Sequence, residues 1–228
     1  MRLAEIYKSV QGEGSLVGRT SVFVRVSGCN LRCWFCDTPF ASWQPQGDDF
    51  SVEEVVAEVE LLEAEDVVIT GGEPMLFAEL IPLCEQLKAR NKHITIETAG
   101  TLYLPVFCDL MSISPKLSNS IPAPDQHPKW SKRHAHSSDR PDIVQRLIDE
   151  HRYQLKFVID QPTDCDEVMQ YLKQFKNVDR QAVWLMPQGT DRDALDRTAE
   201  WLEPYCQSQG VRYCPRKQIE WFGLVRGT

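Results

Sequence analysis

The sequence predicts an α/β fold, an open or partial parallel β/α barrel, and three observations favour this class. Short runs of β-branched and apolar residues recur along the chain, and helical patterns stand between several of them. A strand followed by a helix, repeated, gives parallel pairing with right-handed crossovers. The chain has 228 residues, whereas a closed barrel of eight units takes about 250. We therefore expect an open sheet in one domain, residues 1–228.

The individual elements follow from local patterns. Strands are expected at residues 21–27, 66–70, 93–97, 109–114, 153–159, 182–186 and 211–214. Helices are expected at residues 51–64, 75–90, 141–151, 164–175 and 191–209. Ser51 and Glu54 have the spacing of a capping box, and Gly210 is placed to end the last helix.

Residues 117–141 interrupt the alternation of strand and helix patterns. The segment is rich in Pro, Ser and His and has no apolar periodicity, which predicts a long variable loop that serves as a lid or a docking surface. His127, His134 and His136 could be imagined as zinc ligands, but no nearby cysteine or carboxylate pattern completes a set of four. A solvated loop is the preferred interpretation.

Composition narrows the class of function. A formal net charge of −8 argues against binding to nucleic acid, because phosphate backbones attract clustered cations. No run approaches the roughly 18 apolar residues of a membrane span, and the first residues lack the pattern of an export signal. We therefore expect a cytoplasmic protein with reduced thiols. Five of its eight cysteines stand singly among apolar residues and are interpreted as small hydrophobic side chains: Cys84, Cys108, Cys165, Cys206 and Cys214.

The other three cysteines, Cys29, Cys33 and Cys36, lie within eight residues of one another in "SGCNLRCWFCDTPFASW". A buried trio fits poorly with the polar residues between them, and a redox pair of Cys33 and Cys36 leaves Cys29 without a role. Structural zinc requires four ligands, and no other Cys or His lies within twenty residues on either side of these three cysteines. A [4Fe–4S] cluster can be held by three thiolates with one iron left open, and Trp34 and Phe35 would shield it from solvent.

Four further motifs follow directly after expected strands, and the carboxyl ends of parallel strands form the edge where ligands gather. The motifs are "GGEP" at 71–74, "ETAGT" at 97–101, "SPK" at 114–116 and "MPQG" at 186–189. We expect them to share one site with the cysteines.

The spacing Cys29-x3-Cys33-x2-Cys36 resembles the cluster motif of the radical S-adenosylmethionine superfamily, in which the open iron binds the methionine moiety of the cosubstrate. The run Gly71-Gly72-Glu73-Pro74 looks like the superfamily's glycine-rich turn. From "IYKSVQGEG" to "LVRGT", and least over 117–150, the chain is similar to the 7-carboxy-7-deazaguanine synthase family.

This resemblance implies a set of ligand-binding residues. The cluster would be held by Cys29, Cys33 and Cys36. S-adenosylmethionine would contact Phe35, Cys36, Asp37, Gly72, Ser114, Pro115, Lys116, Leu185, Met186, Pro187 and Gln188, with Glu97 as a further candidate. The substrate would contact Val10, Gln11, Gly12, Arg25, Thr70 and Thr228, the last through a terminal carboxylate. Thr38 would bind magnesium. Glu220 departs from the family pattern, because a histidine commonly stands there.

The resemblance also implies an activity. The family converts 6-carboxy-5,6,7,8-tetrahydropterin into 7-carboxy-7-deazaguanine with loss of ammonia, a step of queuosine and deazapurine biosynthesis. The cofactors would be a [4Fe–4S] cluster, S-adenosylmethionine and Mg²⁺. Homolytic cleavage of S-adenosylmethionine would give a 5′-deoxyadenosyl radical, which takes a hydrogen atom from C6 of the pterin.

A homodimer and a flavodoxin or ferredoxin as electron donor are implied too, with Lys129, Lys132, Arg133 and Arg140 as residues that would face an acidic donor. Two alternatives stay open. One is an activase that makes a glycyl radical on a partner protein, against which "QGEG" and Arg25 argue. The other is a metal-binding module without catalysis.

Overall fold

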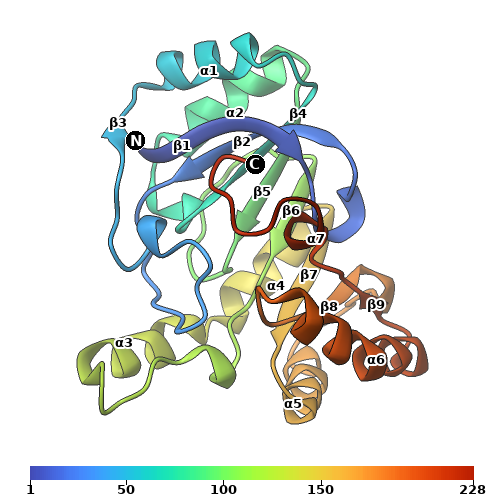
Figure 1. Cartoon of the computed structure of the whole chain (residues 1–228). Coiled ribbons are helices and arrows are strands. Elements are labelled where there is room, and N and C mark those ends of the chain that lie inside the picture. Colours follow the sequence, from blue (N-terminus) through green and yellow to red (C-terminus); the bar gives the residue numbers. More distant parts are fainter.

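The computed structural model describes residues 1–228, and its nine strands form one open sheet (Figure 1). The strands are β1 (Arg2–Val10), β2 (Thr20–Val26), β3 (Asp48–Asp49), β4 (Asp66–Gly71), β5 (His93–Thr98), β6 (Leu110–Ile113), β7 (Tyr153–Ile159), β8 (Val183–Pro187) and β9 (Arg212–Tyr213). Their order is β3-β1-β2-β4-β5-β6-β7-β8-β9, and every pairing from β2 to β9 is parallel. The ends β3 and β9 do not pair, so the expected open sheet is confirmed.

The helices are α1 (Val52–Leu61), α2 (Leu80–Ala89), α3 (Pro128–Ser138), α4 (Pro141–Glu150), α5 (Pro162–Leu172), α6 (Arg192–Gln209) and α7 (Lys217–Phe222). Five of them match expected helices. Ser51 and Glu54 form the capping box of α1, and Gly210 ends α6 in the left-handed conformation at φ 67°. In Figure 1, α1 and α2 lie at the top of the view and α5 and α6 at its bottom, and buried side chains of these helices and of α4 form one core with the sheet. None of these helices is long and apolar enough to span a bilayer.

The strand β1 was not expected from the sequence. Most of its residues are half-buried instead of alternating between buried and exposed, so its period-2 signal is weak. The strand forms because it pairs antiparallel with β2, in a register that places Glu5 opposite Arg25 and Tyr7 opposite Phe23. Pairing with β2 adds an antiparallel edge to an otherwise parallel sheet.

The expectation of a loop over residues 117–141 was wrong for Ser118–Ser120, a 3₁₀ turn, and for Pro128–Ser138, which form α3. Pro128 occupies the first turn of α3, where a missing N–H is harmless. The low apolar content hides this helix, since only one face packs against the protein, with Ser131 and His134 buried. His134 has no exposed surface, so its expected solvation was also wrong.

All eight cysteines are free thiols. The five that were interpreted as small hydrophobic residues are all buried. Cys214 also accepts a hydrogen bond from the Gly14 N–H at 3.2 Å. Cys29, Cys33 and Cys36, in contrast, line the cavity described below.

Candidate active site

A cavity of about 340 Å³ lies at the carboxyl ends of the parallel strands. The predicted site residues that line it are Val10, Gln11, Gly12, Arg25, Cys29, Cys33, Phe35, Cys36, Asp37, Thr38, Thr70, Gly72, Glu97, Ser114, Lys116, Met186, Gln188 and Thr228. Three predicted residues lie outside the lining and are buried: Pro115, Leu185 and Pro187. The Leu185 carbonyl accepts the Cys214 N–H at 2.8 Å. One cavity thus brings together residues from position 10 to position 228.

The segment 27–43, here called the cysteine loop, follows β2 and is held by side chains that bond to its backbone. The Arg32 guanidinium donates to the carbonyls of Cys29 and Leu31, each at 2.6 Å. The Trp43 indole N–H donates to the Cys33 carbonyl at 2.9 Å. These bonds replace the ladder that a helix or strand would supply, so the loop has a defined shape although it has little regular structure.

Helix α3 supports the cysteine loop from outside. His134 Nδ1 accepts the Arg32 N–H at 3.0 Å, and His134 Nε2 lies 2.9 Å from Ser120 Oγ. Because Ser120 Oγ donates to the Leu117 carbonyl at 2.6 Å, the imidazole must be the donor to Ser120. Burial lowers the pKa of His134 to about 4, which keeps the ring neutral, and its two hydrogen bonds fix the tautomer.

The aromatic residues of the cysteine loop do not both shield the cysteines, as the sequence had suggested. Phe35 lines the cavity. Trp34 lies outside it with 52% of its surface exposed, and its indole N–H donates to the Asn119 carbonyl at 2.6 Å. Trp34 therefore lies on the outer surface of the cysteine loop, away from the cavity.

At the glycine-rich turn after β4, the backbone closely approaches the backbone of the cysteine loop. A Cβ on Gly72 would lie 1.9 Å from the Gly28 carbonyl oxygen, so only glycine fits against the start of the cysteine loop. Next to it, the buried carboxylate of Glu73 accepts bonds from Thr98 Oγ1 at 2.7 Å, the Ala99 N–H at 2.8 Å and the Met75 N–H at 3.1 Å. Burial raises the pKa of Glu73 nonetheless. Glu73 thereby ties the ends of β4 and β5 together beneath the site.

The three thiols fit a cluster better than a single ion. No group of three or more His, Cys, Asp or Glu side chains converges as the ligands of one metal ion, which is what structural zinc requires. Burial raises the pKa of both Cys29 and Cys33 to about 12, so the thiols are neutral in this environment and would ionise on binding metal. Three thiols on one wall of an open cavity suit a [4Fe–4S] cluster with one iron facing the cavity.

Arg25 is held in place by β1. Its Nε donates to Glu5 Oε1 at 2.7 Å, and its Nη2 donates to Tyr7 Oη at 2.8 Å. Burial acts to lower the pKa of Arg25, but Tyr7 and Glu5 raise it further, so the group stays charged. The guanidinium is therefore a fixed cation in the cavity wall.

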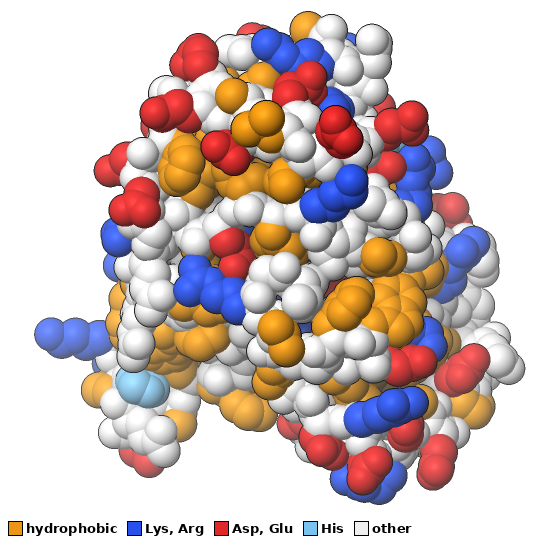
Figure 2. Space-filling model, turned by 45° about the horizontal axis from the view of Figure 1, so that its top comes forward, with side chains coloured by type: hydrophobic (Ala, Val, Ile, Leu, Met, Phe, Trp, Pro, Cys, Tyr) orange, Lys and Arg blue, Asp and Glu red, His pale blue; other side chains and the backbone are white.

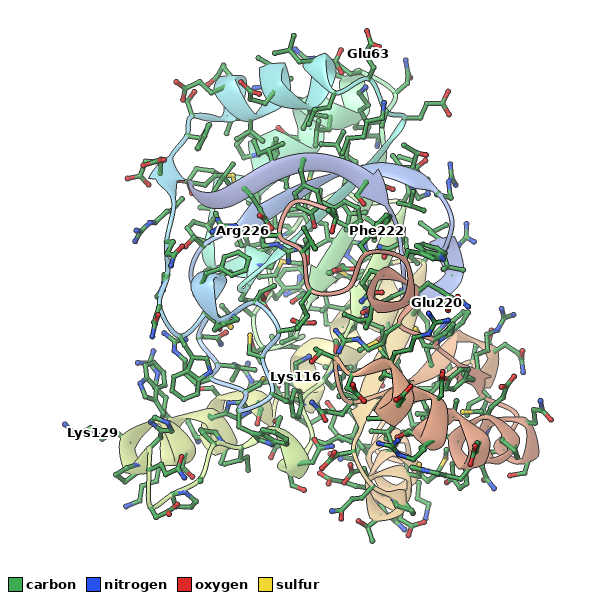
Figure 3. The ribbon with its side chains drawn as sticks, viewed as in Figure 1. Glu63, Lys116, Lys129, Glu220, Phe222 and Arg226 are labelled. Carbon is green, nitrogen blue, oxygen red and sulfur yellow. The ribbon has the colours of Figure 1, made fainter.

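The C-terminal segment, residues 223–228, passes over the same part of the cavity. In Figure 3 Arg226 lies beside β1 in front of the sheet. Its Nε donates to Glu5 Oε2 at 2.9 Å and its Nη2 to the Ala4 carbonyl at 2.8 Å. Glu5 thus holds two arginines, one in β2 and one in the C-terminal segment.

A group of buried charges on the cavity wall was missed by sequence reasoning. In this charged cluster, Glu13 pairs with Lys156 and lies 3.6 Å from Arg216 Nε, while Arg216 also pairs with Asp37. Burial acts to raise the pKa of Glu13, but Lys156 and Arg216 lower it to about 2. The available signal was Lys156 within the apolar strand "YQLKFVI", where a lysine needs a partner.

Glu97 joins the charged cluster to predicted substrate residues. Its carboxylate accepts Thr70 Oγ1 at 2.7 Å and Gln11 Nε2 at 3.3 Å, and it lies 4.0 Å from Lys156 Nζ. Side chains from the ends of β1, β4 and β5 and from the middle of β7 therefore meet at one carboxylate.

Comparisons with known proteins agree with this geometry. The sequence profile of the Radical SAM superfamily matches residues 23–140, which contain the cysteine loop and the glycine-rich turn. The 7-carboxy-7-deazaguanine synthase of Rhodopirellula baltica is 44% identical, over 99% of this chain and 88% of that protein. The chain belongs to the 7-carboxy-7-deazaguanine synthase family. Another member, from Halobacterium salinarum, is 40% identical over 94% of this chain and 88% of its own length.

The fold of the family is also seen in the crystal structure of QueE from Escherichia coli. That structure covers 94% of this chain, and the chain covers 92% of it, with a TM-score of 0.69 and 22% sequence identity. The open sheet predicted from the sequence is therefore also the fold of the Escherichia coli protein.

Proposed function

We propose that this chain is a 7-carboxy-7-deazaguanine synthase, a carbon–nitrogen lyase that converts 6-carboxy-5,6,7,8-tetrahydropterin into 7-carboxy-7-deazaguanine with loss of ammonia. Its cofactors are a [4Fe–4S] cluster, S-adenosyl-L-methionine and Mg²⁺. The observation that carries the proposal is that three thiols and the fixed cation of Arg25 line one cavity of about 340 Å³.

Cys29, Cys33 and Cys36 would hold the cluster. When bound, the cluster and S-adenosyl-L-methionine would supply the radical chemistry needed to remove a hydrogen atom from the substrate. The protein's part is to position these groups and to keep water away from them. The cysteine loop is suited to this task, because Arg32, Trp43 and His134 all bond to its backbone.

The cosubstrate would lie between the cysteine loop and the ends of β4, β6 and β8. The residues proposed for it are Phe35, Cys36, Asp37, Gly72, Ser114, Pro115, Lys116, Leu185, Met186, Pro187 and Gln188. Lys116 Nζ donates to the carbonyl and the Oγ of Ser114, each at 2.7 Å, and so holds the end of β6 in one shape. Since the side chain of Leu185 is fully buried, its backbone would be the contact.

The substrate would lie on the β1 side of the cavity, with its carboxylate against Arg25. A guanidinium fixed by Glu5 and Tyr7 loses little conformational entropy when it binds a planar carboxylate. Val10, Gln11, Gly12, Thr70 and Thr228 complete the proposed set. Glu97 was expected from the sequence to contact S-adenosylmethionine; because it accepts bonds from Gln11 and Thr70, we propose that it would instead accept the N–H groups of the pterin.

Thr38 is proposed as the protein ligand of magnesium. Its hydroxyl is a hard oxygen donor beside the cavity, and Mg²⁺ commonly keeps waters and substrate oxygens as its remaining ligands. Because Asp37 and Thr38 directly follow Cys36, one loop would then contact the cluster, the cosubstrate and the metal.

We also propose the wider setting of the enzyme: one domain over residues 1–228, a homodimer, a cytoplasmic location and a flavodoxin or ferredoxin as reductant. Support for the compartment comes from eight free thiols, which persist in a reducing environment. Support for the reductant comes from superfamily membership, because the cluster would have to receive one electron before S-adenosyl-L-methionine could be cleaved.

The test is anaerobic turnover of 6-carboxy-5,6,7,8-tetrahydropterin by reconstituted wild type, Arg25→Ala and Arg19→Ala, with dithionite as reductant. Arg19 precedes β2, at the opposite end of the strand from Arg25, and pairs with Asp66 at 2.8 Å. We expect Arg25→Ala to lose about a hundredfold in turnover with its cluster intact, and Arg19→Ala to match wild type. Deoxyadenosine release without pterin turnover in wild type would contradict the substrate assignment. Wild-type KM in Arg25→Ala would contradict the role of Arg25.

A further inference from the structure

The outer face of α3 is a basic surface on an acidic protein. Lys129, Lys132, Arg133 and His136 follow the spacing i, i+3, i+4 and i+7, which places them on one helix face, and all four are exposed. No Asp or Glu occurs between residues 126 and 138, although the chain carries a net charge of −8. In Figure 3 Lys129 points away from the body of the protein, and in Figure 2 a basic side chain stands clear at the left edge.

The inner face of α3 fixes this surface to the cysteine loop. His134 bonds to the Arg32 backbone, and the Arg32 guanidinium lies 4.1 Å from the ring centroid of Trp130. The segment leading into α3 bonds to the loop as well, because the Trp34 N–H donates to the Ser120 carbonyl at 3.2 Å. The basic face therefore has a defined position relative to the three cysteines.

Trp34 is an exposed aromatic residue of the cysteine loop, and its indole and backbone N–H groups bond to the turn Ser118–Ser120 that precedes α3. It stands between Cys33 and Phe35 and keeps 52% of its surface exposed. Exposed aromatic residues supply contact area at protein-docking surfaces, and charges steer the approach of the partner.

The composition of this surface decides what kind of partner fits it. Arg140 does not contribute, since it forms an ion pair with Asp142 at 2.8 Å. Lys129, Lys132 and Arg133 are too few to hold a nucleic acid against a net charge of −8. A small acidic protein is complementary to it in charge.

We propose that the outer face of α3, together with Trp34, is the docking site of a small acidic one-electron carrier protein. The docked carrier gives up one electron and is oxidised, and the cluster held by the cysteine loop gains that electron; no bond forms or breaks. This inference rests on the proposed function, which requires a reduced cluster, and it assigns the reductant a place on the surface.

The test compares two charge-reversed variants of the reconstituted enzyme. Lys129→Glu with Lys132→Glu changes the basic face. Lys173→Glu with Lys176→Glu changes two exposed lysines of the same spacing that follow α5, at the opposite end of the sheet from the cysteine loop. The probe is a flavodoxin reduced by NADPH and its reductase. The measurements are the rate at which reduced flavodoxin bleaches the cluster absorbance, the Kd of flavodoxin and pterin turnover.

We expect the α3 variant to slow flavodoxin-driven bleaching and turnover by about tenfold or more at low ionic strength and to raise the Kd, since steering charges act mainly on association. The defect should shrink near 1 M salt, where the Debye length is about 3 Å. Dithionite-driven turnover should stay at the wild-type rate, and the α5 variant should behave as wild type throughout.

Three outcomes would overturn the proposal: an α3 variant that flavodoxin reduces normally, an equal loss with dithionite, or an equal loss in the α5 variant. Absence of dithionite-driven pterin turnover in wild type would instead contradict the proposed function. Failure of the docking site and failure of the function are therefore distinguishable.

Discussion

The cysteine loop and the charged cluster form two walls of the same cavity, and they are built in different ways. The cysteine loop takes its three thiols from eight consecutive residues after β2. The charged cluster takes Glu13, Lys156 and Arg216 from segments more than 50 residues apart and pairs them with almost no exposure of Lys156 or Arg216. The first wall depends on local spacing, whereas the second depends on the whole sheet.

Because of this difference, substitutions in the cysteine loop should impair cluster binding, whereas substitutions in the charged cluster should impair stability. Removing a thiol from the cysteine loop removes a ligand but leaves little strain, because the loop is bonded through its backbone. Removing one charge from the cluster leaves its partner buried and unpaired, which is costly for folding. The following variants test whether the two walls fail in these separate ways, from the largest expected effect to the smallest.

Cys33→Ala should abolish turnover because one corner of the cluster loses its ligand, while the fold stays intact. The measurements are iron per chain, visible absorbance and the far-UV circular dichroism spectrum. Cys206→Ala is the matched control, since Cys206 is buried in α6 away from the cavity. A fully loaded, active Cys33→Ala enzyme would refute the ligand assignment.

Lys156→Met should lower the free energy of unfolding by about 3–5 kcal/mol, because Glu13 and Glu97 would lose their buried cation. Urea unfolding of Lys156→Met, of Glu13→Gln and of the double variant measures the coupling free energy between the two side chains. We expect the double variant to recover at least 1 kcal/mol relative to the sum of the single losses. Simple additivity would mean that the two side chains do not form a structural pair.

Glu13 should make stability depend on acid pH. Its pKa is lowered to about 2 in the folded protein, so the contribution is complete above the ordinary value near 4.5 and is lost as the pH falls from there to about 2. The shift corresponds to about 3 kcal/mol. The free energy of unfolding should therefore fall more for wild type than for Glu13→Gln between pH 5 and pH 2.5. Urea unfolding at each pH measures this free energy. Parallel curves for the two proteins would argue against the ion pair.

His134→Ala should destabilise the protein by about 1–3 kcal/mol, because the Arg32 N–H and the Ser120 hydroxyl would lose a buried partner. His136→Ala, two residues later on the exposed face of α3, is the matched control and should change thermal unfolding little. Since His134 acts through the loop backbone, the variant should also bind iron less firmly than wild type. Equal melting temperatures for the two variants would show that α3 does not support the cysteine loop.

Local patterns predicted those parts of the fold whose signals are contained in a few residues. The parallel strands are rich in β-branched and apolar residues, and α1 has both its capping box and its apolar face in one stretch. The strand β1 and the helix α3 escaped prediction because each is stabilised by one face that contacts a distant segment. His134 illustrates this point, since its partners are Arg32 and Ser120.

The sequence by itself determined the chemistry of this protein: three thiols at fixed spacing, a glycine-rich turn after a strand, and an arginine four residues before the first cysteine. Residue type and short spacing are enough for these features, because a loop after a strand keeps neighbouring residues together. Only the tertiary structure decided that Glu13, Lys156 and Arg216 pair, that Glu5 holds both Arg25 and Arg226, and that α3 supports the cysteine loop. These contacts join residues that are brought together by strand order and register, which the whole sheet fixes.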